Sequence, residues 1–148
     1  MKNNIVRHWD LALLVLILAL ALALRLLGID FGLPYVFYPD EAVIVNHAVA
    51  FGTGDLNPHY FNYPSLYMYV MFVIYGLIYV VGWLTGIFAS TADFARLFFN
   101  DVTLFYLPGR LISAVCGVAS VAMVYLLGRR TYNVRVGLMS AAFLAFSV

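Results

Sequence analysis

The residues best suited to chemistry are Asp40 and Glu41, two adjacent carboxylates in the stretch "YPDEAVIVNHAVAF". A carboxylate at the rim of a membrane-embedded apolar surface is partly desolvated, which makes it a better general base for taking a proton from an attacking hydroxyl. In a helix, the spacing of Asp40, Ile44 and His47 places all three on one side. Simpler roles are also open: Asp40 as a helix N-cap and Glu41 as a first-turn acid facing the helix dipole.

Further polar residues follow in "GDLNPHYFNYPS". Asp55 is most simply explained as a turn residue ahead of Asn57 and Pro58. The remaining polar and aromatic side chains form a strip that can stack on a sugar or bind a lipid headgroup; an ordinary interfacial belt of aromatic residues explains them equally well. With His47, this strip supplies the candidate substrate-binding residues His59, Tyr60, Asn62 and Tyr63.

Metal and thiol chemistry have little support in the pattern. The acids and histidines near Asp40 could supply metal ligands, but their spacing matches no known ligand pattern such as H-E-x-x-H. A divalent cation held by Asp40 or Glu41 therefore stays an open alternative, and no other cofactor is indicated. Cys116 is the single cysteine, which excludes an intrachain disulfide, and we expect a buried and inert thiol.

Composition places these residues in a membrane protein. Of the 148 residues, 65% are hydrophobic and 10% are charged. A soluble domain is about 45–50% apolar and about 25% charged. The net charge of +1 gives no basic face for nucleic acid. We therefore expect an all-α, multi-pass protein of the plasma or cytoplasmic membrane, built from apolar helices.

The first apolar run, residues 11–29, is long enough to cross a bilayer. Lys2 and Arg7 precede it, as basic residues do in a signal peptide. A signal peptide has a shorter apolar core, of about 7–15 residues, and ends in small residues. We therefore expect an uncleaved transmembrane helix with the N-terminus in the cytoplasm.

The second apolar run, residues 65–89, decides the topology. If it crossed the membrane, as do 11–29 and 107–128, the arginines after residue 128 would lie outside, against the positive-inside rule. Its many Tyr and Trp residues favour the interface. We therefore expect a juxtamembrane helix within an extracytoplasmic loop of residues 30–107, although the run is long enough to cross.

Two further helices complete the expected organisation. Pro39 and the "GTG" at 52–54 bound a second juxtamembrane helix at about 41–51. Residues 136–148 begin another apolar helix, which at about 1.5 Å per residue reaches only about 18 Å of the roughly 30 Å hydrocarbon core. This shortfall suggests the N-terminal part of a longer polytopic protein.

In this order, "YPDEA", "LNPHYFNYPSLYMY" and "PGRLISAVCGVASVAMVYLLGRR" resemble the N-terminal part of the GT-C superfamily of membrane glycosyltransferases. The chain is most similar to the dolichyl-phosphate-mannose protein mannosyltransferase-like branch, which includes the bacterial lipid A aminoarabinose transferases. The resemblance covers about residues 10–148. An Asp-Glu pair alone is weak, but the three motifs in sequence are more specific.

The resemblance implies an enzyme that moves a mannose-like sugar from a polyprenyl-phosphate donor to an extracytoplasmic protein, lipid or glycan acceptor, with inversion. Asp40 corresponds to the family's catalytic carboxylate, with Glu41 beside it. The two juxtamembrane helices correspond to 41–51 and 65–89. Arg110 could contact the donor phosphate or anchor a helix end.

Two other classes of function stay open. A membrane scaffold or transporter subunit would function at this length, and would be a stable folded product of 148 residues. A lipid-binding protein would retain the loop and bind polyprenyl phosphate without transferring sugar. Sugar transfer is the observation that separates both classes from the enzyme.

Overall fold

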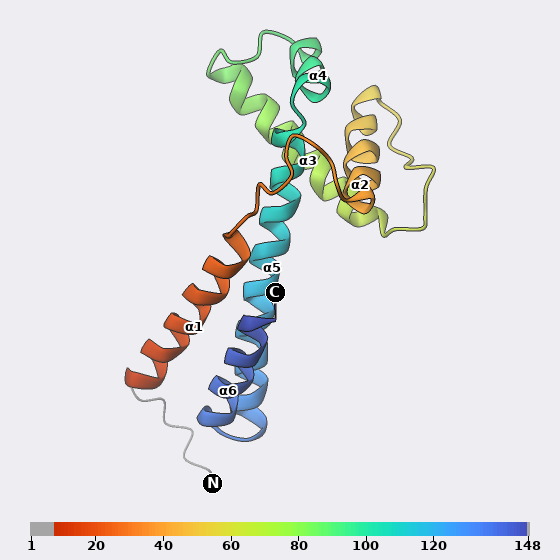
Figure 1. Ribbon diagram of the computed structural model, residues 1–148. Coiled ribbons are helices and arrows are strands. Elements are labelled where there is room, and N and C mark those ends of the chain that lie inside the picture. Colours follow the sequence, from red (N-terminus) through yellow and green to blue (C-terminus); the bar gives the residue numbers. More distant parts are fainter. Residues whose placement is uncertain (1–7, 148) are drawn as a thin grey trace. The chain divides into compact units, whose positions relative to one another are not determined.

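The computed structural model describes residues 8–147, and every regular element in that range is a helix (Figure 1). The all-α prediction is therefore confirmed. Lys2, Arg7 and Val148 lie outside the described residues. The elements are α1 (His8–Leu26), α2 (Pro39–Ala50), η1 (Phe51–Thr53, a 3-10 turn), α3 (Ser65–Leu84), α4 (Thr91–Asn100), α5 (Thr103–Thr131) and α6 (Val134–Phe146).

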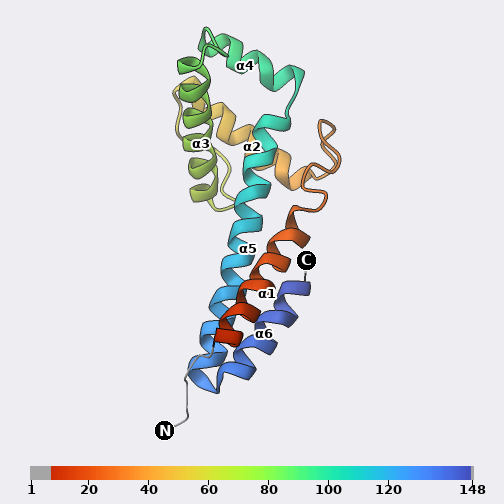
Figure 2. The same ribbon diagram turned by 90° about the vertical axis from the view of Figure 1, so that its left-hand side faces the viewer.

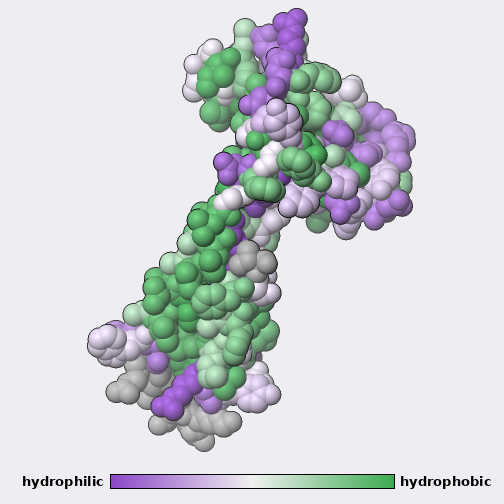
Figure 3. Space-filling model, in the orientation of Figure 1, coloured by the Kyte–Doolittle hydropathy of each residue, from purple (hydrophilic) through white to green (hydrophobic). Residues whose placement is uncertain are grey.

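Three of these helices, α1, α3 and α5, are long and apolar enough to cross a membrane. This indicates a multi-pass membrane protein. Hydrophobic side chains cover most of the visible surface of α1, whereas the loop after α2 is largely hydrophilic (Figure 3). The 20 residues of α3 agree with a span as well as with the juxtamembrane helix expected from the sequence.

The chain divides into two compact units. The first unit contains the chain up to Ile29 and from Arg110 onward; the second contains Asp30–Gly109. Helix α5 contributes its first turns to the second unit and the rest to the first.

In the first unit, α1 and α6 lie side by side (Figures 1 and 2). The core is made largely of small and branched residues from three helices: Ile17, Ala21, Val121, Tyr125, Val134, Leu138, Ala141 and Ala145. A Cβ added at Gly128 would lie 2.8 Å from the Cα of Gly137, so α5 and α6 touch backbone to backbone. Small residues permit such close approach between membrane helices.

Arg25, near the end of α1, binds the C-terminal end of α6. Its guanidinium donates hydrogen bonds to the carbonyls of Ala145 at 3.3 Å, Leu144 at 3.4 Å and Ser147 at 3.1 Å. The last carbonyls of a helix have no intrahelical donor, so the arginine satisfies them. A Cβ at Gly117 would collide with the Arg25 side chain, so this glycine makes room for it.

In the second unit, α2 packs against α3, and aromatic rings fill much of the core. Phe51 stacks on Tyr69 with ring centroids 4.9 Å apart, and Phe105 is almost fully buried at 1% exposure. The Tyr75 hydroxyl donates to the Phe105 carbonyl at 2.8 Å, which satisfies a buried polar group.

Helix α2 begins one residue earlier than the proposed cap position, which makes Asp40 a first-turn residue. The prediction of Asp40 as N-cap is therefore wrong. Tyr38 is the N-cap, with φ −104° and ψ 107°, and Pro39 occupies the first turn. Proline favours an extended residue before it and suits the first helical turn, which explains the shift.

The other helix ends also differ from the predicted ranges. The helix predicted for 65–89 ends at Leu84, because Gly86 adopts φ +78° and Ile87 and Phe88 both donate to the Gly82 carbonyl. The helix predicted for 107–128 is longer and starts at Thr103, where the Asp101 carboxylate accepts from the Thr103 N–H at 2.9 Å.

Helix α4 was missed in the sequence. It begins after Ser90, whose hydroxyl oxygen accepts from the Asp93 N–H at 3.2 Å and donates to the Asp93 carboxylate at 2.9 Å. The pattern "STAD" is the signal that could have revealed it, since Ser followed three residues later by an acid is a helix-start pattern.

Candidate functional site

Helix α2 and the loop before α3 bring four of the predicted site residues into one row. Two come from the helix, Asp40 and His47, and two from the loop, Tyr60 and Tyr63. The Tyr63 hydroxyl donates to Asp40 Oδ1 at 2.6 Å. The ring of Tyr63 stacks on that of Tyr60 with ring centroids 5.9 Å apart, and the ring centroids of Tyr60 and His47 are 5.1 Å apart. We call these four residues the Asp40–His47 row.

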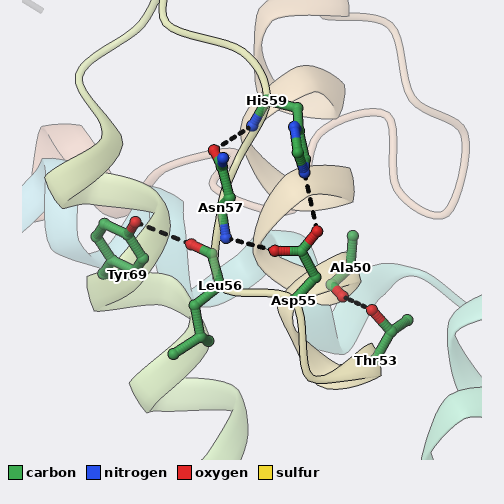
Figure 4. Close-up of polar contacts among 7 residues, drawn as sticks. All are labelled: Ala50, Thr53, Asp55, Leu56, Asn57, His59 and Tyr69. Atoms are coloured by element: carbon green, nitrogen blue, oxygen red, sulfur yellow. Dashed lines mark hydrogen bonds and ion pairs between the residues drawn. The ribbon is translucent and has the colours of Figure 1, made fainter.

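The loop returns to α2 because its first residues form consecutive turns (Figure 4). Gly54 adopts φ +96°, a conformation that favours glycine. The Asp55 carboxylate then accepts from the Asn57 N–H at 2.9 Å, and the Asn57 side-chain oxygen accepts from the His59 N–H at 3.1 Å. Both are side-chain turns of the Asx type. The expectation of a turn residue at Asp55 is confirmed.

The loop is also tied to α3. The Tyr69 hydroxyl donates to the Leu56 carbonyl at 2.9 Å (Figure 4). Pro64, which follows Tyr63, has an extended backbone conformation and is the N-cap of α3, which starts at Ser65. The loop is thus held at both ends, which limits where Tyr60 and Tyr63 can lie.

His59 pairs with Asp55 and takes no part in the contacts of the row. Its Nε2 lies 2.8 Å from Asp55 Oδ2, and both side chains are exposed. This side-chain hydrogen bond, with the second one from the Asn57 N–H, holds the pKa of Asp55 below its ordinary value. His59 therefore acts as part of the turn that shapes the loop.

The polar atoms of the row have defined roles. Asp40 is exposed, and the hydrogen bond from Tyr63 is the one its carboxylate makes within residues 8–147. That bond to an acidic partner raises the pKa of Tyr63 above its ordinary value, so the phenol stays a donor at neutral pH. His47 Nδ1 lies 2.6 Å from the Val43 carbonyl oxygen and donates to it, so Nε2 is the ring nitrogen left to bind a ligand.

The remaining predicted site residues lie elsewhere. Glu41 is half-buried in the first turn of α2, and Asn62 is exposed in the loop. Arg110 belongs to the first unit, where its guanidinium donates to the Ile29 carbonyl at 2.8 Å. This contact favours the anchoring role over phosphate binding.

No group of three or more His, Cys, Asp or Glu side chains that could hold a metal ion occurs within residues 8–147. The divalent cation considered for Asp40 or Glu41 therefore has no cluster of three such ligands there. The prediction of a buried Cys116 is wrong, because this thiol, in α5, is exposed.

The arrangement provides an exposed carboxylate, a phenol that orients it and a stacked aromatic surface beside it. A carboxylate of this kind can accept a proton from a hydroxyl, and flat aromatic rings can bind the apolar face of a ring-shaped ligand. Sequence reasoning named these residues singly but missed the bond between Tyr63 and Asp40. No family model, no curated protein and no solved structure matched the chain.

Proposed function

We propose that the chain is part of a membrane glycosyltransferase that moves a mannose-like sugar from a polyprenyl-phosphate donor to an extracytoplasmic acceptor. The observation that carries the proposal is the Asp40–His47 row, in which Tyr63 holds an exposed carboxylate at 2.6 Å beside two stacked tyrosine rings. Three helices that can cross a membrane support a lipid-linked donor, because such a donor enters from the bilayer.

In the proposed reaction Asp40 is the general base. Its carboxylate takes the proton of the acceptor hydroxyl while that oxygen forms a bond to the anomeric carbon of the sugar. The bond from the anomeric carbon to the phosphate oxygen breaks, and polyprenyl phosphate leaves with the electron pair. This single displacement inverts the anomeric centre.

The other residues of the row position the sugar. The rings of Tyr60 and Tyr63 are nearly parallel, 22° apart, and offer a surface on which a sugar ring can stack. His47 Nε2 can accept a hydrogen bond from a sugar hydroxyl, because Nδ1 donates to the Val43 carbonyl. The row contains no permanent cation, so other residues must stabilise the charge of the leaving phosphate.

The first test is Asp40→Asn in the complete protein, assayed for transfer from a polyprenyl-phosphate mannose donor. Removal of a general base should lower kcat by about 100-fold to 10,000-fold. Asp55→Asn is the matched control: it neutralises a second exposed carboxylate of the same unit that lies in the turn and outside the row.

The outcomes separate the candidate functions. Loss of transfer in Asp40→Asn, with membrane expression and melting temperature like those of the unchanged protein, supports the base. Unchanged turnover in that variant would show that Asp40 is not the base. If the unchanged protein binds the donor but transfers no sugar, the lipid-binding alternative replaces the enzyme.

A further inference from the structure

We infer that Tyr63 is a positioning residue, which holds one carboxylate oxygen of Asp40 so that the other can accept the proton of the acceptor hydroxyl. This inference rests on the proposed function, because it assigns Tyr63 a task in the same reaction. It concerns the bond between Tyr63 and Asp40, residues 23 positions apart in the chain.

The geometry is that of a strong hydrogen bond. The distance of 2.6 Å between the Tyr63 hydroxyl oxygen and Asp40 Oδ1 lies in the short range expected for a hydroxyl that donates to a charged carboxylate. The raised pKa of Tyr63 follows from the same contact, because the bond favours the protonated phenol.

Asp40 needs such a partner because nothing else in the described part of the chain restrains its carboxylate. The side chain is exposed in the first turn of α2, where several staggered rotamers are accessible. A catalytic group works only when it is held close to its productive geometry, within about 0.5 Å. The bond from Tyr63 selects one rotamer out of these.

Tyr63 can perform this task because it is itself restrained. Its ring is half-buried and stacks on Tyr60, whose ring in turn lies against His47. Pro64 follows directly and limits the backbone of Tyr63 to extended conformations. The phenol is thereby held by its own loop and, through Tyr60, by the His47 ring on the helix that carries Asp40.

The test compares two tyrosine-to-phenylalanine variants of the complete protein. Tyr63→Phe keeps the stacked ring and removes only the hydroxyl that reaches Asp40. Tyr69→Phe is the matched control, since its hydroxyl also closes this loop, by donating to the Leu56 carbonyl at 2.9 Å, but makes no bond to the row. Transfer from polyprenyl-phosphate mannose is measured over a range of donor concentrations.

We expect Tyr63→Phe to lower kcat by roughly 10-fold, the lower end of the loss seen when a hydrogen-bond partner that orients a metal ligand is removed, and to change the donor KM less than twofold. Tyr69→Phe should keep kcat within twofold. An equal loss of kcat in both variants, or unchanged kcat in Tyr63→Phe, would overturn the inference.

A spectroscopic measurement tests the bond without altering Tyr63. The phenol carbons of labelled tyrosine are titrated by NMR in the unchanged protein and in Asp40→Asn, with the Tyr63 signal assigned from its loss in Tyr63→Phe. The pKa of Tyr63 should fall toward the ordinary value when the charge of residue 40 is removed. An identical titration in both proteins would overturn the inference.

The two levels of the proposal fail in different ways. If transfer persists in Asp40→Asn, Asp40 is not the general base, and Tyr63 then has no catalytic carboxylate to position. Transfer that is lost in Asp40→Asn but unaffected in Tyr63→Phe leaves the proposed function intact and overturns only the positioning role.

Discussion

The two units differ in which charged side chains make their hydrogen bonds. In the first unit, the guanidinium groups of Arg25 and Arg110 donate to backbone carbonyls, those of α6 and that of Ile29. In the second unit, the carboxylates of Asp40 and Asp55 are exposed and bond to the side chains of Tyr63 and His59. The first unit thus uses two cations to bind backbone carbonyls, whereas the second has exposed carboxylates, of which Asp55 also accepts from the Asn57 backbone N–H.

The two units also differ in the side chains that pack in their interiors. Gly128 and Gly137 bring α5 and α6 of the first unit into backbone contact. The second unit instead packs large rings around Phe105, with Tyr75 and Phe98 at centroid distances of 5.3 and 5.1 Å. Beside these rings lies a cavity of about 430 Å³, lined by residues that include Gly52, Gly76 and Phe94. The contact between α5 and α6 is thus close, whereas the aromatic core of the second unit lies beside an open cavity.

The largest stability effect should come from breaking the close contact. In Gly137→Ala, the new Cβ would lie 2.7 Å from the Tyr125 carbonyl oxygen and 2.9 Å from the Arg129 nitrogen. Both atoms belong to the backbone and cannot swing away, so α5 and α6 must separate. We expect a loss of about 1–3 kcal/mol in the free energy of unfolding, measured in detergent micelles.

The same substitution in the second unit should have the opposite sign. A Cβ added at Gly76, inside α3, would meet no atom within 4 Å. Alanine is a better helix former than glycine, so Gly76→Ala should stabilise the protein by about 0.5–1 kcal/mol. Destabilisation by Gly76→Ala in the same unfolding assay would contradict the contrast in packing.

The smallest effect concerns the pair of Asp55 and His59. The bonds from His59 and from the Asn57 N–H hold the pKa of Asp55 below its ordinary value of 3.8. A carboxyl whose pKa is lowered in the folded state stabilises that state above its ordinary pKa, and this contribution is lost as the pH falls through the folded pKa. The loop should therefore loosen only in acid, below about pH 4.

An NMR titration of the Asp55 carboxyl carbon measures this effect. In His59→Ala the midpoint should rise toward the ordinary value. Asp101 serves as an internal reference, because its pKa is lowered by Thr103 and should not respond to His59. A midpoint of Asp55 that stays in place in His59→Ala would show that the pair does not hold the turn.

Apolar runs were enough to predict the long helices, because about twenty apolar residues span a bilayer whatever the surrounding fold. Local helix-start signals were less informative. The pattern "STAD" at the start of α4 follows directly on the run predicted as one helix up to residue 89, and α4 was therefore not predicted. The start of α2 was predicted one residue too late, because Pro39 occupies the first turn and the N-cap is Tyr38, not Asp40.

The candidate site was predictable as a set of residues and not as an arrangement. The row forms because Gly54 adopts φ +96° and the side chains of Asp55 and Asn57 close the turns that follow. These turns depend on backbone conformations that composition and spacing do not determine. The contact between Tyr63 and Asp40 therefore required the folded loop.

The Arg25 contact has a consequence for the order in which the protein is made. Arg25 and the Ala145 carbonyl that it binds are 120 residues apart. At roughly 5–20 residues per second, α1 is synthesised roughly 6–24 s before the end of α6 exists. Until then the Arg25 guanidinium, in the last turn of α1, lacks the carbonyls that it binds in the folded protein. The contact between the end of α1 and the end of α6 therefore forms only after the whole of α6 has been made.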